Sequence, residues 1–301
     1  MNKFLSEEWQ VFYRKRKSDI LNDTDNSKFN IIRGNFRYWC ADPFIIEENG
    51  KAFVFAEMYD RLKHKGAIGY CILSENGNYS PWKKVLECPW HLSYPFIYKR
   101  GGDFYMIPES YVSGKVSIYK AAAFPEKWEE IKVIANCPCV DTTIQEINNK
   151  KYIFTTICEN EKTVISSFND EMFDPNKAQV INNKYNQARS AGKFFTHDEM
   201  LIRPAQDCTG EYGKAINLYI PAISNGIYSE KLLKKITADQ INTNERIKAA
   251  GIHTYNLSEH YEVIDIKRYS FNLVWFIIRP FDYLKRRINR LFNDRNKENN
   301  S

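Results

Sequence analysis

The chain has 301 residues, a formal net charge of +6 and 15% aromatic residues, enough to bury a sizeable core in one large domain or two. Seven scattered cysteines without a pair of CxxC motifs, and a start (MNKFLSEEWQ) without an apolar leader, predict a reduced, cytosolic protein. The charge forms no basic stripe, which argues against a nucleic-acid partner. Without a phosphate loop or zinc-ligand spacing, the sequence indicates no cofactor and no metal. The alternative is that carboxylates around a channel hold a hard cation such as Ca²⁺.

Residues 1–30 form a polar N-terminal segment that we expect to lie outside the folded domain. Within it, Asp23-Thr24-Asp25 has the DxD pattern that holds a metal ion in many glycosyltransferases. The motif lies in the stretch NDTDNS, with no strand leading into it, and this context favours a solvated turn. We therefore assign no metal-binding role to it.

A sixteen-residue unit recurs five times along the chain and is the main signal for the fold. The copies, aligned without gaps, read DPFIIEENGKAFVFAE from Asp42, YPFIYKRGGDFYMIPE from Tyr94, DTTIQEINNKKYIFTT from Asp141, GKFFTHDEMLIRPAQD from Gly192 and, more weakly, HTYNLSEHYEVIDIKR from His253. Each is an apolar strand, a polar turn and a second apolar strand. The turn slots ENG, RGG, INN, THD and SEH suit hairpin loops, so the sequence predicts five β-hairpins.

The copies start about 47 to 61 residues apart, close to the length of a four-stranded propeller blade. Two further strands fit in each interval, such as AIGYCILS and WKKVLE after the first hairpin, or KVSIYKA and WEEIKVI after the second. A β-sandwich would also contain many hairpins, but it does not require this regular spacing. We therefore predict an all-β fold, a five-bladed β-propeller over residues 31–268.

The repeat also predicts a cluster of polar side chains. In a propeller the innermost strands line a central channel and the next strand runs antiparallel, so the first and last residues of each unit meet at one channel end. Ten residues occupy these positions: Asp42, Glu57, Tyr94, Glu109, Asp141, Thr156, Gly192, Asp207, His253 and Arg268. Mutual repulsion of five carboxylates costs stability unless a ligand uses them, which makes this rim a candidate site. The alternative is that these residues only satisfy the blade ends.

Several motifs along the chain resemble a known family: YWCADPFI, HLSYPFIY, YMIPES, AAAFPEKW, VDTT, ARSAGKFF, IRPAQDC with YGKAINLYI, and GIHTYN. They are similar to the propeller domain at the N-terminus of plant glucosamine inositolphosphorylceramide transferases, whose stand-alone bacterial relatives are associated with surface-polysaccharide synthesis. The resemblance runs from about Trp39 to Arg268. That domain is distantly similar to the five-bladed furanosidase superfamily of arabinanases, invertases and levansucrases, which act on furanosides such as arabinofuranose and fructose.

The resemblance implies catalytic roles for individual residues. The superfamily's first-blade Asp, a nucleophile or general base, matches Asp42 in ADPF, and its third-blade Asp, which steers protonation or stabilises the transition state, matches Asp141 in VDTT. Its general acid is usually a Glu on a later inner strand, but the corresponding stretch ARSAG has Arg189 instead. Glu109 and Asp207 are candidates to replace this acid. Two such carboxylates can cleave or form a glycosidic bond, and their separation decides the stereochemical course.

Further side chains near the rim are candidates for substrate binding. Arginine forks bind phosphate bidentately, so Arg189 and Arg203 are candidate ligands of a nucleotide-sugar diphosphate; the alternative is that they neutralise the carboxylate ring. His91 and His253 could transfer protons or bind sugar hydroxyls. The remaining candidates are Trp39, Glu57, Tyr94 and Gln206.

After Arg268 the composition changes. Residues 271–278 are apolar but too few to span a bilayer. Apolar side chains then recur at helical spacing among Lys and Arg residues: Phe281, Leu284, Ile288 and Leu291. We expect residues 269–301 to form a basic amphipathic helical tail that contacts an anionic inner-membrane surface, each basic residue adding roughly 1 kcal/mol. The alternative is a helix that docks on the propeller or on a partner subunit.

The resemblance and the composition together imply a cytoplasmic glycosyltransferase that is peripheral on the inner membrane. Its partners would be a nucleotide-activated sugar donor and a glycan or lipid-linked glycan acceptor, and its product would belong to a bacterial capsule or O-antigen. A furanose such as fructose is one candidate for the transferred sugar. Two alternatives stay open: a glycoside hydrolase on the same scaffold, and a non-catalytic glycan-binding module.

Overall fold

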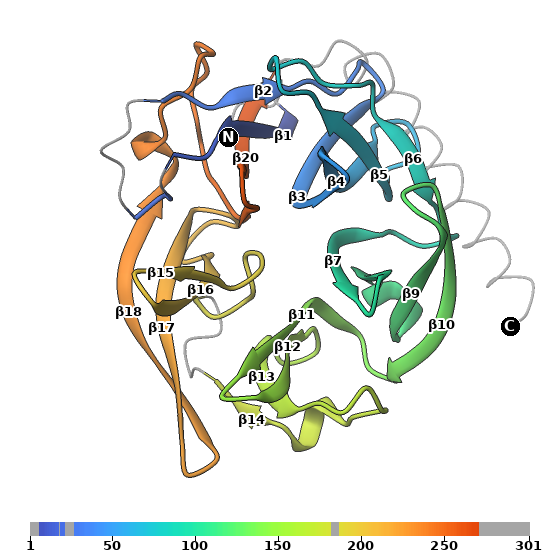
Figure 1. Cartoon of the computed structure of the whole chain (residues 1–301), viewed down its shortest axis with the longest axis vertical. Coiled ribbons are helices and arrows are strands. Elements are labelled where there is room, and N and C mark those ends of the chain that lie inside the picture. Colours follow the sequence, from blue (N-terminus) through green and yellow to red (C-terminus); the bar gives the residue numbers. More distant parts are fainter. Residues whose placement is uncertain (1–5, 18, 22–26, 182–186, 271–301) are drawn as a thin grey trace, which may run out of the picture. The chain divides into compact units, whose positions relative to one another are not determined.

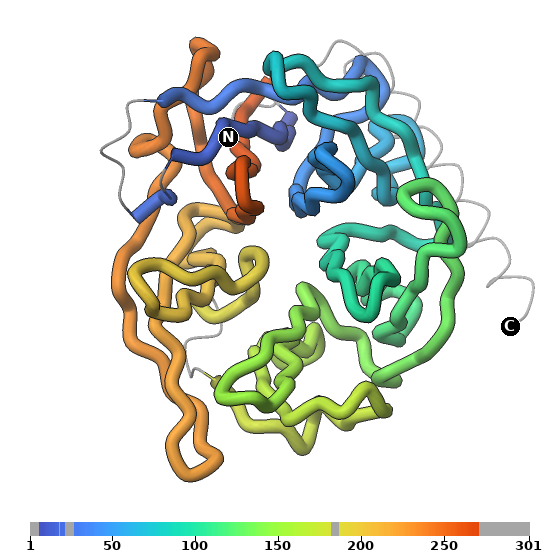
Figure 2. Tube along the Cα trace, viewed as in Figure 1, coloured from blue at the N-terminus to red at the C-terminus, as the bar shows by residue number. Residues whose placement is uncertain are grey.

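The computed structural model describes residues 6–17, 19–21, 27–181 and 187–270. Within the body that runs from Trp9 to Arg268, five four-stranded sheets are arranged around a central axis (Figures 1 and 2). This is the predicted five-bladed β-propeller. The 3₁₀ helices η1 (Tyr111–Ser113), η2 (Pro175–Lys177) and η4 (Ala238–Gln240) lie in its connections.

Each of the first four blades is built from four consecutive strands. The first blade contains β3 (Tyr38–Glu48), β4 (Lys51–Asp60), β5 (Lys65–Leu73) and β6 (Lys83–Leu86), and the second β7 (Ser93–Arg100), β8 (Asp103–Glu109), β9 (Val116–Ala123) and β10 (Lys127–Ala135). The third contains β11 (Cys139–Ile147), β12 (Lys150–Ile157), β13 (Lys162–Ser167) and β14 (Gln179–Val180), and the fourth β15 (Phe195–His197), β16 (Met200–Asp207), β17 (Ala215–Ser224) and β18 (Ile227–Thr237). The outer strands predicted for the first two blades are therefore confirmed.

The fifth blade is completed by the N-terminal segment. Its strand order is β19 (Tyr255–Leu257), β20 (Tyr261–Ser270), β1 (Ser6–Lys15) and β2 (Asn30–Ile32). Val11 pairs with Ile32, and both side chains are buried. The prediction that residues 1–30 lie outside the propeller is therefore wrong, because β1 satisfies the edge that β20 would otherwise expose. The DxD motif falls within residues 22–26, outside the described residues.

The five predicted inner hairpins are present. In the first three blades both turn residues have positive φ, as two-residue type I′ turns require: Asn49-Gly50, Gly101-Gly102 and Asn148-Asn149. In the fourth blade the turn is at residues 198–199, later than the predicted THD slot. In the fifth blade Leu257 pairs with Glu262 across a longer loop. The turn chemistry therefore located every hairpin and misplaced the shorter ones.

The hairpins of the fourth and fifth blades also have a different register. In the first blade the third residue of the repeat, Phe44, pairs with the fourteenth, Phe55. In the fifth blade the third residue, Tyr255, pairs with the twelfth, Ile264. The gapless alignment is therefore wrong by two residues in these copies. Their last residues do not take the position that Glu57 has in the first blade.

In each of the first four blades, a residue with positive φ lies in the inner strand or just before it, at the channel end. Asp42, Tyr94 and Asp141 have φ values of 51°, 40° and 52°, and Gly192 has 135°. In the first three blades the strand register breaks at this residue, which forms a bulge. Positive φ is uncommon and strained for residues other than glycine, and such strain concentrates at binding and catalytic sites. The start of the repeat thus marks a strained residue at the channel end in each of the first three blades.

Aromatic packing between blades fixes the start of the first inner strand. Phe44 packs edge-to-face on Tyr94 and Phe96 of the second blade, with ring centroids 4.8 and 6.1 Å apart. All three side chains are buried. Because Phe44 follows Asp42 by two residues, this contact holds the strained residue against the next blade.

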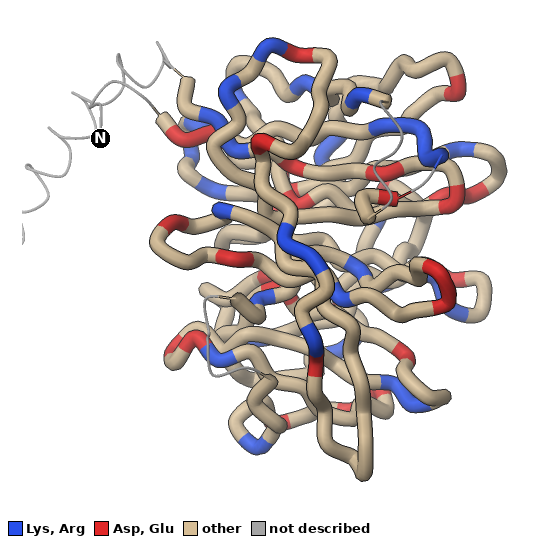
Figure 3. Tube along the Cα trace, turned by 90° about the vertical axis from the view of Figure 1, so that its left-hand side faces the viewer, with Lys and Arg blue, Asp and Glu red and all other residues tan. Residues whose placement is uncertain are grey.

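Two expectations concern the surface and the C-terminus. On the side shown in Figure 3, Lys and Arg alternate with Asp and Glu, and the described residues there form no continuous basic stripe. The helical tail predicted for residues 269–301 lies outside the described residues from residue 271 onward. In the part of the chain that the structure describes, no helix has the length and apolar character needed to cross a membrane.

Candidate active site

Asp42 lies at the channel end of β3, and its buried carboxylate joins three blades. Thr254 Oγ1 donates to Oδ1 at 2.9 Å, and the backbone N–H of Tyr94 donates to Oδ2 at 3.2 Å. Burial raises the pKa of Asp42 to about 6, with His253 opposing the shift and the carboxylate of Asp265 adding to it. A carboxylate with a pKa close to neutral suits the work of a general base.

A buried Asp-His pair supports Asp42 from the fifth blade. Asp265 accepts the backbone N–H groups of His253 and Thr254 at 3.1 and 3.0 Å and that of Asp42 at 2.9 Å. Its Oδ2 also lies 2.6 Å from His253 Nδ1. Burial disfavours the imidazolium, but Asp265 and Asp42 raise the pKa of His253 overall. Because the imidazole stacks on Trp9 at 3.7 Å, the ring is fixed on a second side.

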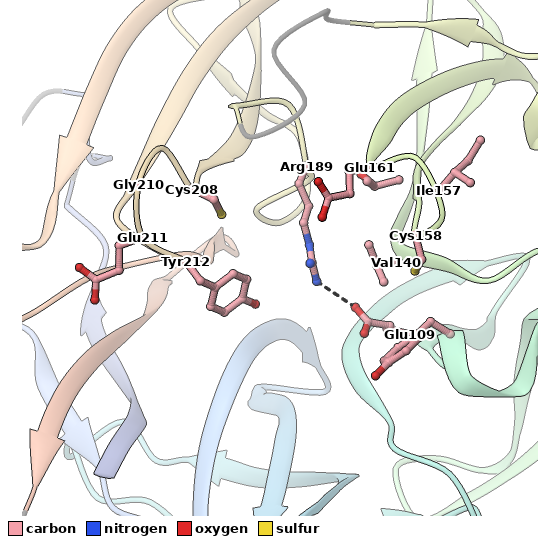
Figure 4. Close-up of a pocket in the computed structure, with 12 residues that line it drawn as sticks. Glu109, Val140, Ile157, Cys158, Glu161, Arg189, Cys208, Gly210, Glu211 and Tyr212 are labelled. Atoms are coloured by element: carbon pink, nitrogen blue, oxygen red, sulfur yellow. Dashed lines mark hydrogen bonds and ion pairs between the residues drawn. The ribbon is translucent and has the colours of Figure 1, made fainter. Parts of the chain in front are cut away.

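Asp141 and Glu109 share one guanidinium group. Arg189 Nε pairs with Asp141 Oδ2, and Arg189 Nη2 lies 3.2 Å from Glu109 Oε2 (Figure 4). Gln206 Nε2 also donates to Asp141 Oδ2, at 2.9 Å. Arg189 therefore places one positive charge against two carboxyl groups of the rim. This matches the second of the two roles expected for it from the sequence.

Glu109 can carry a proton at neutral pH. Burial raises its pKa well above the ordinary range, although Arg189 opposes the shift, and the carboxylate of Asp141 raises it further. Asp42 and Glu109 thus differ in what they can do: one accepts a proton near neutral pH, and the other donates one. Pairs of carboxyl groups with pKa values pushed apart are how a site assigns acid and base roles.

Glu57 and His91 form a second carboxyl–imidazole contact at the same rim. His91 Nδ1 accepts the backbone N–H of Gly66 at 3.0 Å, which leaves Nε2 to carry the proton, 3.3 Å from Glu57 Oε1. Burial lowers the pKa of His91. Burial also raises the pKa of Glu57 well above its ordinary range, with Asp42 and Glu109 adding to the shift. The pair is therefore predominantly neutral.

A cavity of about 620 Å³ opens beside these groups. Glu109 and Arg189 form part of its wall, with Cys158 and Glu161 from the third blade on one side and Tyr212 from the loop after β16 on the other (Figure 4). The Tyr212 ring lies 5.6 Å from the guanidinium carbon of Arg189. An aromatic face beside a few convergent polar groups is the usual composition of a small-ligand site.

The loop that carries Tyr212 is anchored to the fifth blade. Lys267 Nζ donates to the carbonyl of Tyr212 at 2.6 Å, and the backbone N–H of Ile252 donates to the carbonyl of Gly213 at 2.8 Å. Gly213 has a φ of 64°, and a β-carbon there would collide with the Trp9 ring. These contacts make the loop a fixed wall of the cavity.

Two predicted site residues lie elsewhere. Asp207 pairs with Lys235 on β18, whereas Gln206, the residue before it, reaches the channel and contacts Asp141. Arg203 is fully buried and donates from Nε and Nη2 to both carboxylate oxygens of Glu230, at 2.8 and 3.0 Å. Asp207 is thus separated from the proposed acid position, and Arg203 holds an internal carboxylate where a diphosphate was predicted.

Arg203→Met is expected to destabilise the fold rather than alter the chemistry. The substitution leaves Glu230 buried without its cation, which costs roughly 3–5 kcal/mol. Denaturant titration measures this loss in the free energy of unfolding. The exposed pair Arg100–Asp170 (2.7 Å) supplies a matched control, since Arg100→Met removes a surface ion pair worth about 0–1 kcal/mol. Equal losses in the two variants would contradict the structural role of Arg203.

Tyr94 and Trp39, both predicted to bind substrate, have different surroundings. Tyr94 is fully buried and crosses the channel: its hydroxyl accepts the Gly192 N–H at 2.9 Å and lies 2.9 Å from Thr143 Oγ1. Trp39 stacks on Tyr59, with ring centroids 4.4 Å apart, and lines a second, smaller pocket. The 620 Å³ cavity is bordered by neither.

The structure gathers most of the remaining predicted residues at one channel end: Asp42, Glu57, His91, Glu109, Asp141, Arg189, Gln206 and His253. Sequence reasoning missed Asp265 and Tyr212. A lone acid inside the apolar strand VIDIK was the available signal for Asp265, because a buried carboxylate needs partners. Tyr212 begins the motif YGKAINLYI, so the resemblance marked its position but assigned it no role. Asp42, His253 and Asp265 each offer a ligand atom within 4.8 Å of the others, but hydrogen bonds already engage them.

Sequence comparisons identify relatives of the chain. A family profile described as "Glucosamine inositolphosphorylceramide transferase 1, N-terminal" matches residues 30–261. Glucosamine inositolphosphorylceramide transferase 1 of Oryza sativa subsp. indica is 30% identical over 192 residues, 60% of this chain and 26% of that protein. The Arabidopsis thaliana protein of the same name is 31% identical over 205 residues, 63% of this chain and 26% of that protein. The chain thus spans about a quarter of the length of these curated relatives.

Solved structures share the fold. A GH43 β-xylosidase/α-arabinofuranosidase from a compost metagenome has a TM-score of 0.56 at 10% identity, covering 79% of this chain and 94% of that one. The GH62 α-L-arabinofuranosidase catalytic domain of Coprinopsis cinerea has a TM-score of 0.55 at 11% identity, covering 85% and 97%. The α-L-arabinanase of Cellvibrio cellulosa, complexed with arabinohexaose, has a TM-score of 0.51 at 12% identity, covering 69% and 87%. At these identities the likeness concerns the propeller architecture alone.

Proposed function

Because this chain belongs to the family of glucosamine inositolphosphorylceramide transferase N-terminal domains, we propose that its propeller is a glycosyltransferase acting on a glycan or lipid-linked glycan. One observation carries the proposal. Asp42, with a pKa of about 6, lies at the same channel end as the Arg189–Asp141–Glu109 cluster, and Arg189 and Glu109 line a cavity of about 620 Å³. The transferase names of the relatives support the reaction class, although this chain spans only part of their length.

In the proposed reaction the acceptor hydroxyl attacks the anomeric carbon of an activated sugar. Asp42 takes the proton of that hydroxyl while the new glycosidic bond forms and the bond from the anomeric carbon to the leaving phosphate breaks. Arg189 faces the cavity and offsets the negative charge that grows on the leaving group. Glu109, protonated, donates a hydrogen bond without adding a second negative charge beside the phosphate.

The proposal also covers the substrates of the enzyme and its location in the cell. The donor is a nucleotide-activated sugar, with a furanose such as fructose among the first to test, and the acceptor is a growing glycan or lipid-linked glycan. The product would belong to a bacterial surface polysaccharide such as a capsule or O-antigen. The enzyme would work on the cytoplasmic side of the inner membrane, with residues 269–301 at its surface.

Glycoside hydrolysis is a second candidate, and the raised pKa of Glu109 favours it. An alkoxide leaving group needs a proton, whereas a nucleoside diphosphate leaves as a stable anion. Glu109→Gln separates the two reactions, because it keeps the shape and removes the acid. A hydrolase should lose roughly 10²–10⁴-fold in rate with an unactivated glycoside. A transferase should lose far less with a nucleotide-activated donor.

The experiment that tests the function is a donor and acceptor screen. The purified chain is incubated with nucleotide-activated sugars, and with unactivated furanosides, in the presence of oligosaccharide or lipid-linked acceptors. Mass spectrometry reads the products of the parent and of Glu109→Gln. Sugar transfer from an activated donor supports the proposal, and release of free sugar from a glycoside selects the hydrolase. Saturable glycan binding without any product would leave the glycan-binding module as the function.

The tail proposal has its own test. Deleting the residues after Ser270 is expected to move the protein from the membrane fraction to the soluble fraction, because the deleted stretch carries an apolar run followed by basic residues. Sedimentation with anionic vesicles at low and high salt measures the change, and a thermal melt checks that the shortened protein is folded. A full-length protein that stays in the supernatant at low salt would contradict membrane contact.

A further inference from the structure

We propose that a basic pocket at the propeller rim binds a phosphate or diphosphate group. The pocket has a volume of about 190 Å³ and lies where the first and fifth blades meet. Arg33 follows β2, Arg61 follows β4 and Arg268 belongs to β20, so three arginines from separate segments line it. Arg33 Nη2 also pairs with Glu245 Oε1 at 2.8 Å, in a half-exposed contact at the edge of the pocket. The identity of the ligand as a donor or acceptor rests on the proposed function, but binding itself does not.

The arginines of this pocket are held in place before any ligand arrives. Arg61 Nη1 donates to the backbone carbonyls of Asn35 and Phe36 at 2.8 and 3.1 Å. The side-chain oxygen of Gln10 accepts from Arg268 Nη2 at 2.6 Å and from Nε at 3.2 Å. A guanidinium fork that is already oriented loses little freedom on binding, and its planar donors match the oxygens of a phosphate.

The pocket is close to the proposed base. Trp9 lines the pocket and also stacks on His253 at 3.7 Å. His253 contacts Asp265, which accepts the backbone N–H of Asp42. Arg268 follows Asp265 by three residues on β20, a distance of about 10 Å at 3.3 Å per residue. The pocket and the support of the proposed base therefore share the Trp9–His253 contact.

The surroundings of the pocket allow two sources for the diphosphate. Phe36 and Leu62 stand in the two loops that hold Arg33 and Arg61, and their side chains are 78% and 45% exposed. Exposed apolar side chains beside cationic ones suit contact with a lipid carrier as well as with a nucleotide. Both sources carry the same chemical group, a diphosphate. Arg203, which the sequence analysis predicted as a phosphate ligand together with Arg189, is occupied by Glu230.

The test is direct binding to the full chain. Calorimetric titration with uridine diphosphate and with inorganic pyrophosphate covers the soluble source. Sedimentation with phosphatidylcholine vesicles, with and without a polyprenyl diphosphate, covers the lipid source. The double variant Arg33→Gln/Arg268→Gln is expected to lose at least roughly tenfold in affinity, about 1.4 kcal/mol. Arg100→Gln, which removes another exposed arginine paired with a carboxylate, is the matched control and should bind as the parent does.

Each outcome decides the proposal. Binding of the soluble diphosphates that the double variant weakens assigns the pocket to a nucleotide, and binding confined to polyprenyl diphosphate vesicles assigns it to a lipid carrier. Absence of binding in every arm, or binding that the double variant leaves unchanged, overturns the pocket. If the double variant fails to melt cooperatively, Arg268→Lys, which keeps the charge and loses the fork, replaces it. Asp42→Asn should bind the diphosphates as the parent does, because residue 42 does not line this pocket. If the parent binds a diphosphate but transfers no sugar, the proposed function is contradicted and the pocket is not.

Discussion

Asp42→Asn is expected to slow turnover roughly 10²–10⁴-fold, the loss typical of removing a general base. Asn adopts positive φ readily, so the left-handed conformation of residue 42 remains accessible. An amide oxygen can also accept the hydrogen bond from Thr254. The substitution therefore removes the proton acceptor and keeps the backbone conformation, at the cost of the hydrogen bond from the Tyr94 N–H. Single-turnover product formation measures the effect, with thermal melts to check folding.

The pH dependence of the turnover rate is a second test of Asp42 as the general base. The pKa of Asp42 is raised to about 6, so the base is ionised above that pH and protonated below it. The rate of the parent should therefore fall as the pH drops below about 6, and Asp42→Asn should lack this limb. Glu57→Gln, a change at another buried carboxyl of the rim, should cost less, and Asp141→Asn should impair turnover. A folded Asp42→Asn protein with near-parental turnover would leave Glu109 as the next candidate.

Arg189→Gln is expected to slow turnover roughly 10²–10³-fold, comparable to the loss of one preorganised charge-stabilising donor. The guanidinium pairs with Asp141 and Glu109 and lines the cavity, so its removal leaves two carboxyl groups facing the position of the leaving group. Asp141 then lacks its cation and repels the phosphate that Arg189 would have stabilised. The turnover rate at saturating donor, measured beside the donor's KM, reports the effect.

Arg189→Lys is the matched comparison. Lysine keeps the positive charge but cannot span two carboxyl groups with one planar fork. We expect it to recover part of the lost rate, whereas Arg189→Gln recovers none. If both variants retain the parental rate and fold normally, Arg189 serves only to neutralise the rim, and the charge on the leaving group is offset elsewhere.

The local pattern of the sequence determined the blades and most of the candidate site. Alternating apolar residues on both sides of turns such as Asn49-Gly50 specify a hairpin within sixteen residues, and the spacing of the copies specifies how many hairpins there are. Asp42, Glu109 and Asp141 were located correctly at one channel end because the first three copies share one register. The strands and the turn of a hairpin are specified by its own sixteen residues, so they can be predicted without knowing where the rest of the chain lies.

The tertiary structure alone decided which polar residues reach the site. Closure of the fifth blade by β1 brings Trp9 onto His253, a contact between residues at opposite ends of the chain. In the fourth blade Gln206 lies beside Asp141, whereas Asp207 pairs with Lys235. Strand register and ring closure depend on pairing and packing between distant segments. A one-residue shift turns every side chain to the other face of the sheet, and a two-residue shift moves each side chain along the strand. No local pattern in the sequence records that choice.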